Sequence, residues 1–129
     1  MSGESSERPL VLVADDDQHI LELVRFALEQ EGCEVIVATD GVQALQLAFD
    51  RLPKMCVLDA MMPNLDGLEA ARRLAADDRT SSIPVLLLTA KDRDEVAASG
   101  FAVGAAEYLQ KPFSPAALQA RVRAVLESE

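Results

Sequence analysis

Four short apolar runs in this sequence are each followed by polar residues of a type that does chemistry. These residues are Asp15, Asp16 and Asp17, then Asp59, Thr89 and Lys111. Carboxylates that lie close together repel one another, so such a group either has raised pKa values or binds a cation. Carboxylate oxygens are hard ligands that suit Mg²⁺ or Mn²⁺ rather than zinc. A cation, a lysine and a hydroxyl together suit a phosphoryl group, and a carboxylate can itself be the nucleophile that forms an acyl phosphate.

Asp59 is the strongest candidate for that nucleophile, because it stands alone at the end of a predicted central strand. Each residue taken singly has an ordinary structural explanation. Asp17 is well placed to cap the helix that follows it, and His19 is expected on the surface of that helix. What favours a functional site is the position of the whole set at four different strand ends. In an open α/β sheet, ligands bind at the carboxyl ends of the strands.

The apolar runs alternate with longer stretches of helical spacing. Runs at 10–14, 35–38, 55–58, 85–88 and 108–109 predict strands, and the first and fourth lack the polar alternation of half-buried strands. Strand and helix alternate five times, which predicts a parallel sheet with helices on both faces. We therefore predict an α/β fold: a five-stranded doubly wound parallel sheet flanked by five helices, in the flavodoxin-like strand order 2-1-3-4-5.

Helices are predicted after each strand. They cover 18–31, 42–50, a stretch that begins after Asp66-Gly67, 93–102, and a stretch that begins after Ser114-Pro115. Aspartate and serine are good N-terminal caps, and Gly32 occupies the position of a left-handed cap after the first helix. The fourth stretch is the weakest, because Ser99 and Gly100 interrupt its apolar pattern.

Length and composition restrict the class of protein. With 129 residues, 50% of them hydrophobic, the chain suits one domain at 9–127 after a short tail at 1–8. The net charge of -10 repels a nucleic acid backbone, so this domain is not expected to bind DNA or RNA directly. The apolar runs are too short to span a membrane, and the polar start excludes a signal peptide. Cys33 and Cys56 are predicted to be buried thiols of a reducing compartment, so the protein is expected in the cytoplasm.

Four segments together resemble a known family, the receiver domains of two-component response regulators, which share the fold of chemotaxis regulators. The segments are VLVADDD at 11–17, VLDAMMPNLDG at 57–67, PVLLLTA at 84–90 and GAAEYLQKPF at 104–113. Their order and spacing are specific to that family, and the resemblance covers about residues 9–127. The segment 111–126 is similar to the regulators that carry a winged-helix DNA-binding domain.

The resemblance implies a role for each residue of the acidic set. Asp59 would accept a phosphoryl group from a phosphohistidine on a sensor histidine kinase or a phosphotransfer protein. Asp16 and Asp59 would bind Mg²⁺ (or Mn²⁺) directly, together with the backbone carbonyl of Met61. Asp15 would act on the metal mainly through water. Such a switch would catalyse only its own phosphorylation and dephosphorylation.

The same resemblance implies how the switch responds. Lys111 would pair with the phosphoryl oxygens, with Ala90 in the same phosphoryl-binding set. Thr89 would turn inward to hydrogen-bond the phosphate, and Tyr108 would follow it from an exposed to a buried rotamer. The peptide bond before Pro112 is expected to be cis. The face made by the fourth helix, fifth strand and fifth helix would then control an output domain or partner, and phosphorylated copies would pair through it.

Two further features concern that face and the extent of the chain. Ala116 and Ala117 stand where winged-helix regulators carry a glutamate that helps them to dimerise, whereas Glu107 and Arg121 are kept. One partner of those intersubunit salt bridges is therefore missing. The sequence ends at Glu129 without an output domain, so we expect either a stand-alone regulator or the receiver of a longer protein.

Other functions fit parts of the pattern. A degenerate receiver that binds partners without phosphorylation would be expected if Asp59, Asp16 or Lys111 were missing, and all are present. A small Mg²⁺-dependent aspartyl phosphatase would place a second aspartate two residues after the nucleophile, where this chain has Met61. A flavin-binding protein would share the fold, but the three aspartates after the first strand would repel the cofactor phosphate. The phosphorylation switch is the favoured interpretation.

Overall fold

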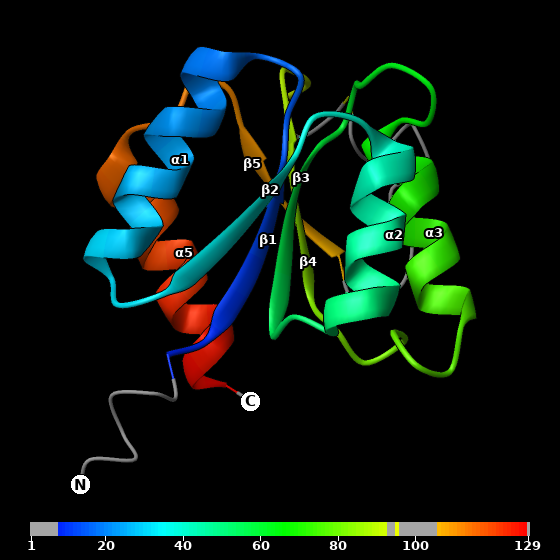
Figure 1. Ribbon diagram of the computed structural model, residues 1–129. Coiled ribbons are helices and arrows are strands. Elements are labelled where there is room, and N and C mark those ends of the chain that lie inside the picture. Colours follow the sequence, from blue (N-terminus) through cyan, green and yellow to red (C-terminus); the bar gives the residue numbers. More distant parts are fainter. Residues whose placement is uncertain (1–7, 93–94, 96–105, 129) are drawn as a thin grey trace, which may run out of the picture.

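The five predicted strands form one parallel sheet, and the first four consist mostly of branched or bulky apolar residues. The strands are β1 (Leu10–Ala14), β2 (Glu34–Ala38), β3 (Met55–Asp59), β4 (Val85–Thr89) and β5 (Ala106–Gln110). All neighbouring strands pair in parallel, in the order β2-β1-β3-β4-β5 (Figure 1). The predicted fold class and strand order are confirmed.

The computed structural model describes residues 8–92, 95 and 106–128. The helices within these residues are α1 (Gln18–Gln30), α2 (Gly41–Arg51), α3 (Gly67–Ala76) and α5 (Pro115–Glu127). The helix predicted over 93–102 lies outside the described residues except for Glu95, and so does most of the tail predicted over 1–8. In the part of the chain that the structure describes, no helix has the length and apolar content that crossing a membrane requires.

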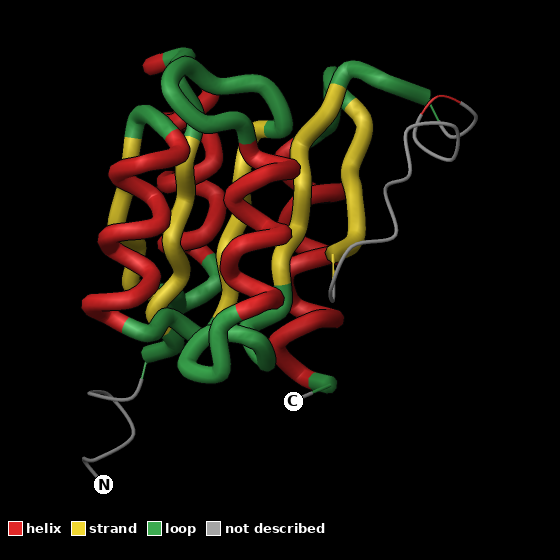
Figure 2. The backbone as a smooth tube through the Cα atoms, turned by 90° about the vertical axis from the view of Figure 1, so that its right-hand side faces the viewer, coloured by secondary structure: helices red, strands yellow, loops and turns green. Residues whose placement is uncertain are grey.

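The sheet separates two helical layers. α1 and α5 cover one face, and α2 and α3 cover the other (Figures 1 and 2). In β1, Val11 and Val13 pack into the core under α1 and α5, whereas Leu12 and Ala14 pack into the core under α2 and α3. Because both faces of the central strands are buried, β1 is apolar at every position and β3 and β4 are apolar up to their last residues, as the sequence predicted. This core fixes the carboxyl ends of the strands along one edge of the sheet.

Four strands are longer than the apolar runs that predicted them: β2 begins one residue earlier, β3 and β4 end one residue later, and β5 covers 106–110 instead of 108–109. Asp59 still pairs with Leu88 of β4, and Thr89 pairs with Gln110 of β5. Backbone hydrogen bonding does not depend on side-chain polarity, so the ladder continues through these polar residues. Asp59 and Thr89 are therefore the last residues of strands rather than the first residues of loops, which holds their backbones in place.

Side-chain caps begin the helices. The predicted caps Asp17, Asp66 and Ser114 each accept a hydrogen bond from a backbone N–H in the first turn of their helix, and Asp40 does the same for α2. Gly32 follows α1 with a φ of +86°, which confirms its predicted left-handed conformation. The caps of α1, α2 and α3 all follow a strand's carboxyl end, so they set the direction in which the chain leaves the sheet.

Gly67 begins α3 directly against the end of β3. Its backbone N donates to the carbonyl oxygen of Ala60 at 3.0 Å. A Cβ atom at Gly67 would lie 2.1 Å from the carbonyl oxygen of Asp59, which is closer than atoms can approach. The first turn of α3 therefore fits against the strand that carries Asp59 only because residue 67 has no side chain.

Substitution Gly67→Ala is expected to lower the free energy of unfolding by about 2–3 kcal/mol, because backbone atoms must move apart to admit the methyl group. Gly32→Ala is the control, since no heavy atom lies within 4 Å of the added Cβ and only the left-handed φ opposes it. That strain costs about 1 kcal/mol. Urea unfolding of both variants measures the difference, and equal losses would contradict this account of Gly67.

Candidate functional site

The carboxyl ends of β1 and β3 bring three aspartates together. One carboxylate oxygen from each of Asp15, Asp16 and Asp59 lies within 4.8 Å of the other two. β1 and β3 are neighbours in the sheet, with Ala14 opposite Leu58, so the residues that follow this pair must meet. Asp15 and Asp59 are buried and Asp16 is exposed. The sheet therefore holds the buried members of the cluster in place, and the cluster is open to solvent on the side of Asp16.

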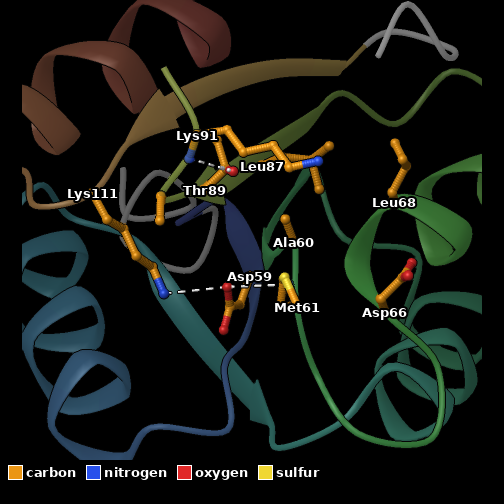
Figure 3. Close-up of a pocket in the computed structure, with 10 residues that line it drawn as sticks. Asp59, Ala60, Met61, Asp66, Leu68, Leu87, Thr89, Lys91 and Lys111 are labelled. Atoms are coloured by element: carbon orange, nitrogen blue, oxygen red, sulfur yellow. Dashed lines mark hydrogen bonds and ion pairs between the residues drawn. The ribbon is translucent and has the colours of Figure 1, made fainter. Parts of the chain in front are cut away.

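Lys111 brings a positive charge to this cluster from the loop after β5 (Figure 3). Its Nζ lies 3.2 Å from Oδ1 of Asp59 and 3.4 Å from Oδ2 of Asp15. Burial by itself lowers the pKa of Lys111, but the charges of Asp15 and Asp59 outweigh it, and the pKa lies above its usual value. Among the described residues, this cluster of three carboxylates thus has one ammonium group, which pairs with Asp15 and Asp59. Such a cluster retains negative charge, which favours a further cation.

Asp15 is the least exposed member of the cluster. Its side chain is fully buried, and its Oδ1 accepts a hydrogen bond from the backbone N of Asp17 at 2.9 Å. Burial raises the pKa of Asp15 to about 6, and the charge of Asp59 also raises it, against the opposing effects of the Asp17 hydrogen bond and the Lys111 charge. The ionised form of Asp15 is therefore less favourable in the folded protein than in the unfolded chain.

A cavity of about 360 Å³ opens beside Asp59 and Lys111 (Figure 3). Thr89 and Ala90 line it from the end of β4, and Oγ1 of Thr89 accepts a hydrogen bond from the backbone N of Lys91 at 3.1 Å. Met61 lines it from the other side and leaves 74% of its own surface exposed. The cavity gives a group attached to Asp59 room beside both the carboxylates and the Thr89 hydroxyl.

The remaining residues named by the resemblance lie at the edge of the sheet. Tyr108 is half-buried on β5 and packs against the core under α2 and α3. Its carbonyl oxygen accepts hydrogen bonds from both terminal nitrogens of Arg121 on α5, at 3.1 and 3.3 Å. The Lys111–Pro112 peptide bond is cis. Strand β5 is thus joined to α5 through a side chain that reaches its backbone.

Some residues that border the cavity were not predicted as part of the site. They are Ala60, Asp66, Leu68 and Leu87. The sequence pattern assigned Asp66 only to the cap of α3, and no spacing signal indicates that the β3–α3 loop turns back beside β4. Asp17 caps α1 and is not part of the cluster of Asp15, Asp16 and Asp59. His19 is exposed on α1. Both residues lie as predicted.

Comparison with known proteins decides the family. The family model for the response regulator receiver domain matches residues 11–123. This chain belongs to the response regulator receiver domain family. The receiver domain is 43% identical over 116 residues to the phosphate regulon transcriptional regulatory protein PhoB of Pseudomonas aeruginosa, covering 90% of this chain and 51% of that protein. It spans about half the length of the curated relatives that it matches.

Solved structures of receiver domains have the same fold. The receiver domain of the Francisella response regulator 1452 aligns with a TM-score of 0.85 at 36% identity, covering 94% of this chain and 98% of that one. The receiver domain of the sensor histidine kinase PA1611 from Pseudomonas aeruginosa, with a magnesium ion coordinated in its active site cleft, aligns with a TM-score of 0.85 at 26% identity. That alignment covers 93% of this chain and 98% of the other.

The raised pKa of Asp15 gives a pH-dependent prediction for the receiver domain. The folded pKa of about 6 lies above the ordinary value of 3.8, so ionisation of Asp15 removes stability as the pH rises from about 4 through 6. Asp15→Asn is therefore expected to raise the free energy of unfolding by about 1–2 kcal/mol at pH 8 and by much less at pH 4. Urea unfolding at both pH values tests this, and a gain that does not change with pH would contradict it.

Proposed function

We propose that this receiver domain is a signalling switch controlled by phosphorylation of Asp59. The observation that carries the proposal is the setting of Asp59. Its carboxylate shares a cluster with two others, lies 3.2 Å from the ammonium of Lys111, and borders a cavity of about 360 Å³. The phosphoryl donor is a phosphohistidine on a sensor histidine kinase or a phosphotransfer protein, in keeping with membership of the response regulator family.

The donor atoms of the cluster fit Mg²⁺ or Mn²⁺. Asp16 and Asp59 would hold the ion directly with the backbone carbonyl of Met61, and Asp15 would hold it mainly through water. The three converging carboxylates are hard oxygen ligands fixed on two strand ends, which is the ligand chemistry that these ions prefer. When bound, the ion would neutralise carboxylate and phosphoryl oxygens together. The magnesium ion in the cleft of the PA1611 receiver domain supports this assignment.

In the transfer step, one carboxylate oxygen of Asp59 attacks the phosphorus atom of the phosphohistidine. A P–O bond forms while the P–N bond breaks, and the electron pair of that bond remains on the histidine nitrogen, which takes up a proton from solvent. Lys111 Nζ, already within hydrogen-bond distance of Asp59, donates to the phosphoryl oxygens as they arrive. Hydrolysis reverses the change when water attacks phosphorus and the Asp59 carboxylate leaves.

Phosphorylation adds charge and acceptor oxygens beside Thr89. The Thr89 hydroxyl now accepts from the Lys91 backbone, and in the switch it turns to donate to the phosphoryl group, with Ala90 beside it. Tyr108 then moves toward the space that Thr89 leaves. Because Arg121 joins the Tyr108 carbonyl to α5, a shift of β5 is passed to that helix. Within the described residues, the responding surface comprises β5 and α5.

The responding surface controls a further region of the same protein or a separate partner. PhoB of Pseudomonas aeruginosa, a transcriptional regulatory protein of about twice this length, supports control of a further region that regulates transcription. The receiver itself, with its net charge of -10, does not contact the nucleic acid. Any pairing of phosphorylated copies through the same surface would lack the glutamate that Ala116 and Ala117 replace, and Arg121 in the present structure lies 3.7 Å from Glu107 of its own chain.

Phosphoryl uptake from acetyl phosphate tests the proposal. Intact mass is expected to show one added phosphoryl group on the wild type with Mg²⁺, little addition when Mg²⁺ is chelated, and none on Asp59→Asn. The control is Asp50→Asn, which changes an exposed aspartate on α2 and should behave like the wild type. Equal uptake by Asp59→Asn would contradict the assignment. No uptake by folded wild-type protein would favour a receiver that binds its partners unmodified.

The phosphoryl group on Asp59 is expected to persist for minutes or longer without a phosphatase. Met61 and Lys91 both line the cavity beside Asp59, where a large apolar chain and a long side chain hinder the approach of water. Met61→Ser should shorten the lifetime several-fold. Val42→Ser, which changes another exposed apolar residue away from the site, should leave it unchanged. Loss from the wild type within seconds, or equal lifetimes in both variants, would show that Met61 does not protect the acyl phosphate.

A further inference from the structure

The loop at residues 60–66, between β3 and α3, carries a backbone group that the metal site needs. Met61 lies two residues beyond the end of β3, outside the ladder of hydrogen bonds that holds Asp59. Its side chain is largely exposed and provides no anchor in the core. Mg²⁺ accepts only a narrow range of ligand distances and angles. The affinity of the site therefore depends on how firmly this loop is held in place.

One side-chain pair ties the loop to the turn between β2 and α2. Nδ2 of Asn64 donates to Oδ2 of Asp40 at 3.0 Å, between residues 24 positions apart in the chain. The other oxygen of Asp40 accepts from the backbone N of Gln43 at 2.8 Å as the cap of α2. The bond from Gln43 and the bond from Asn64 both hold the pKa of Asp40 below its usual value. Asp40 is thus an ionised acceptor with one oxygen on the helix and one on the loop.

Backbone packing brings the same two segments into contact. A Cβ atom at Gly41 would lie 1.9 Å from the carbonyl oxygen of Leu65, so the loop rests directly on the first turn of α2. Asn64 has a φ of +70°, a left-handed conformation that asparagine and glycine adopt more readily than other residues. The chain therefore reverses at Asn64 and places both its side chain and the next carbonyl against α2.

We propose that Asp40 and Asn64 are positioning residues that hold the β3–α3 loop for divalent cation binding at Asp15, Asp16 and Asp59. The inference rests on the proposed function of that cluster. Neither residue is a ligand, and both act through the placement of the Met61 backbone three residues before Asn64. α2 thereby supports the metal site, although it contributes no group to the acidic cluster or to the cavity.

The variants that test this pair are chosen to preserve the backbone. Asn64→Gly removes the amide and keeps a residue that tolerates a φ of +70°. Asp40→Ser removes the oxygen that accepts from Asn64 and keeps a good cap for α2. Gln43→Ala is the matched control, because it removes the side-chain hydrogen bond to Thr39 in the same turn without touching the β3–α3 loop.

The first readout is the affinity for Mg²⁺ alone, from amide chemical shifts during a titration. Asn64→Gly and Asp40→Ser are each expected to weaken binding roughly tenfold, at the lower end of the effect that outer-shell changes have. The double variant should be little weaker than either single one, and Gln43→Ala should match the wild type. Hydrogen exchange without metal is the second readout, and the amides of residues 61, 62, 64 and 65 should exchange faster in both single variants.

Binding by Asn64→Gly within twofold of the wild type, or effects that add fully in the double variant, would overturn the positioning role. Urea unfolding of each variant shows whether a loss of affinity merely follows a loss of global stability, and an equal loss in Gln43→Ala would also count against the pair. Wild-type protein that binds no Mg²⁺ would overturn the metal assignment itself. That result differs from one in which the wild type binds and the variants do not weaken.

Discussion

Repulsion among three carboxylates at neighbouring strand ends is the constraint on which the rest of this structure depends. Asp15, Asp16 and Asp59 lie within 4.8 Å of one another, and the ammonium of Lys111 offsets only part of their charge. The chain holds them together because β1 and β3 are central strands whose apolar residues are buried on both faces. Burial, and to a smaller extent the charge of Asp59, raises the pKa of Asp15, so the ionised carboxylate costs the folded state free energy. A bound cation would relieve this repulsion, whereas a phosphoryl group on Asp59 adds negative charge and so increases the need for the cation and for Lys111.

The two layers of helices serve this charged edge in different ways. α1 and α3 begin with caps at the strand ends next to the cluster, and α2 supports the loop that follows β3. α5 instead receives a contact from the far side of the site, through Arg121 and the carbonyl of Tyr108. A phosphorylation switch needs a change of charge at one site and an element that responds to it. The clustered carboxylates provide the site, and Arg121 links β5 to α5 at the edge of the sheet.

The sequence allowed most of the fold to be predicted, because doubly buried strands and capped amphipathic helices leave strong local patterns. Strand order, the polar strand ends and the caps at Asp17 and Asp66 follow from those patterns and are confirmed. The exact ends of the strands were harder to predict. The backbone hydrogen bonds between strands continue through Asp59 and Thr89, where the apolar pattern has already stopped. The family resemblance, rather than spacing, named Met61 and Tyr108.

Contacts between distant loops could not be predicted from spacing. The Asp40–Asn64 hydrogen bond and the approach of Leu65 to Gly41 depend on how two loops meet after both have left the sheet. The hydrogen bonds from Arg121 to the carbonyl oxygen of Tyr108 depend on the rotamer of the arginine side chain. The spacing of apolar residues does not predict that rotamer. These contacts need the three-dimensional structure, and they are the ones that connect the acidic cluster to its surroundings.

Thermal unfolding of the wild type with increasing Mg²⁺, at an ionic strength held constant with KCl, tests the central claim most directly. If the clustered carboxylates form a divalent cation site, the unfolding temperature rises with the logarithm of the Mg²⁺ concentration once the site begins to fill. Asp16→Asn should move that rise to higher concentrations. An unfolding temperature that does not respond to Mg²⁺ at constant ionic strength would contradict the account.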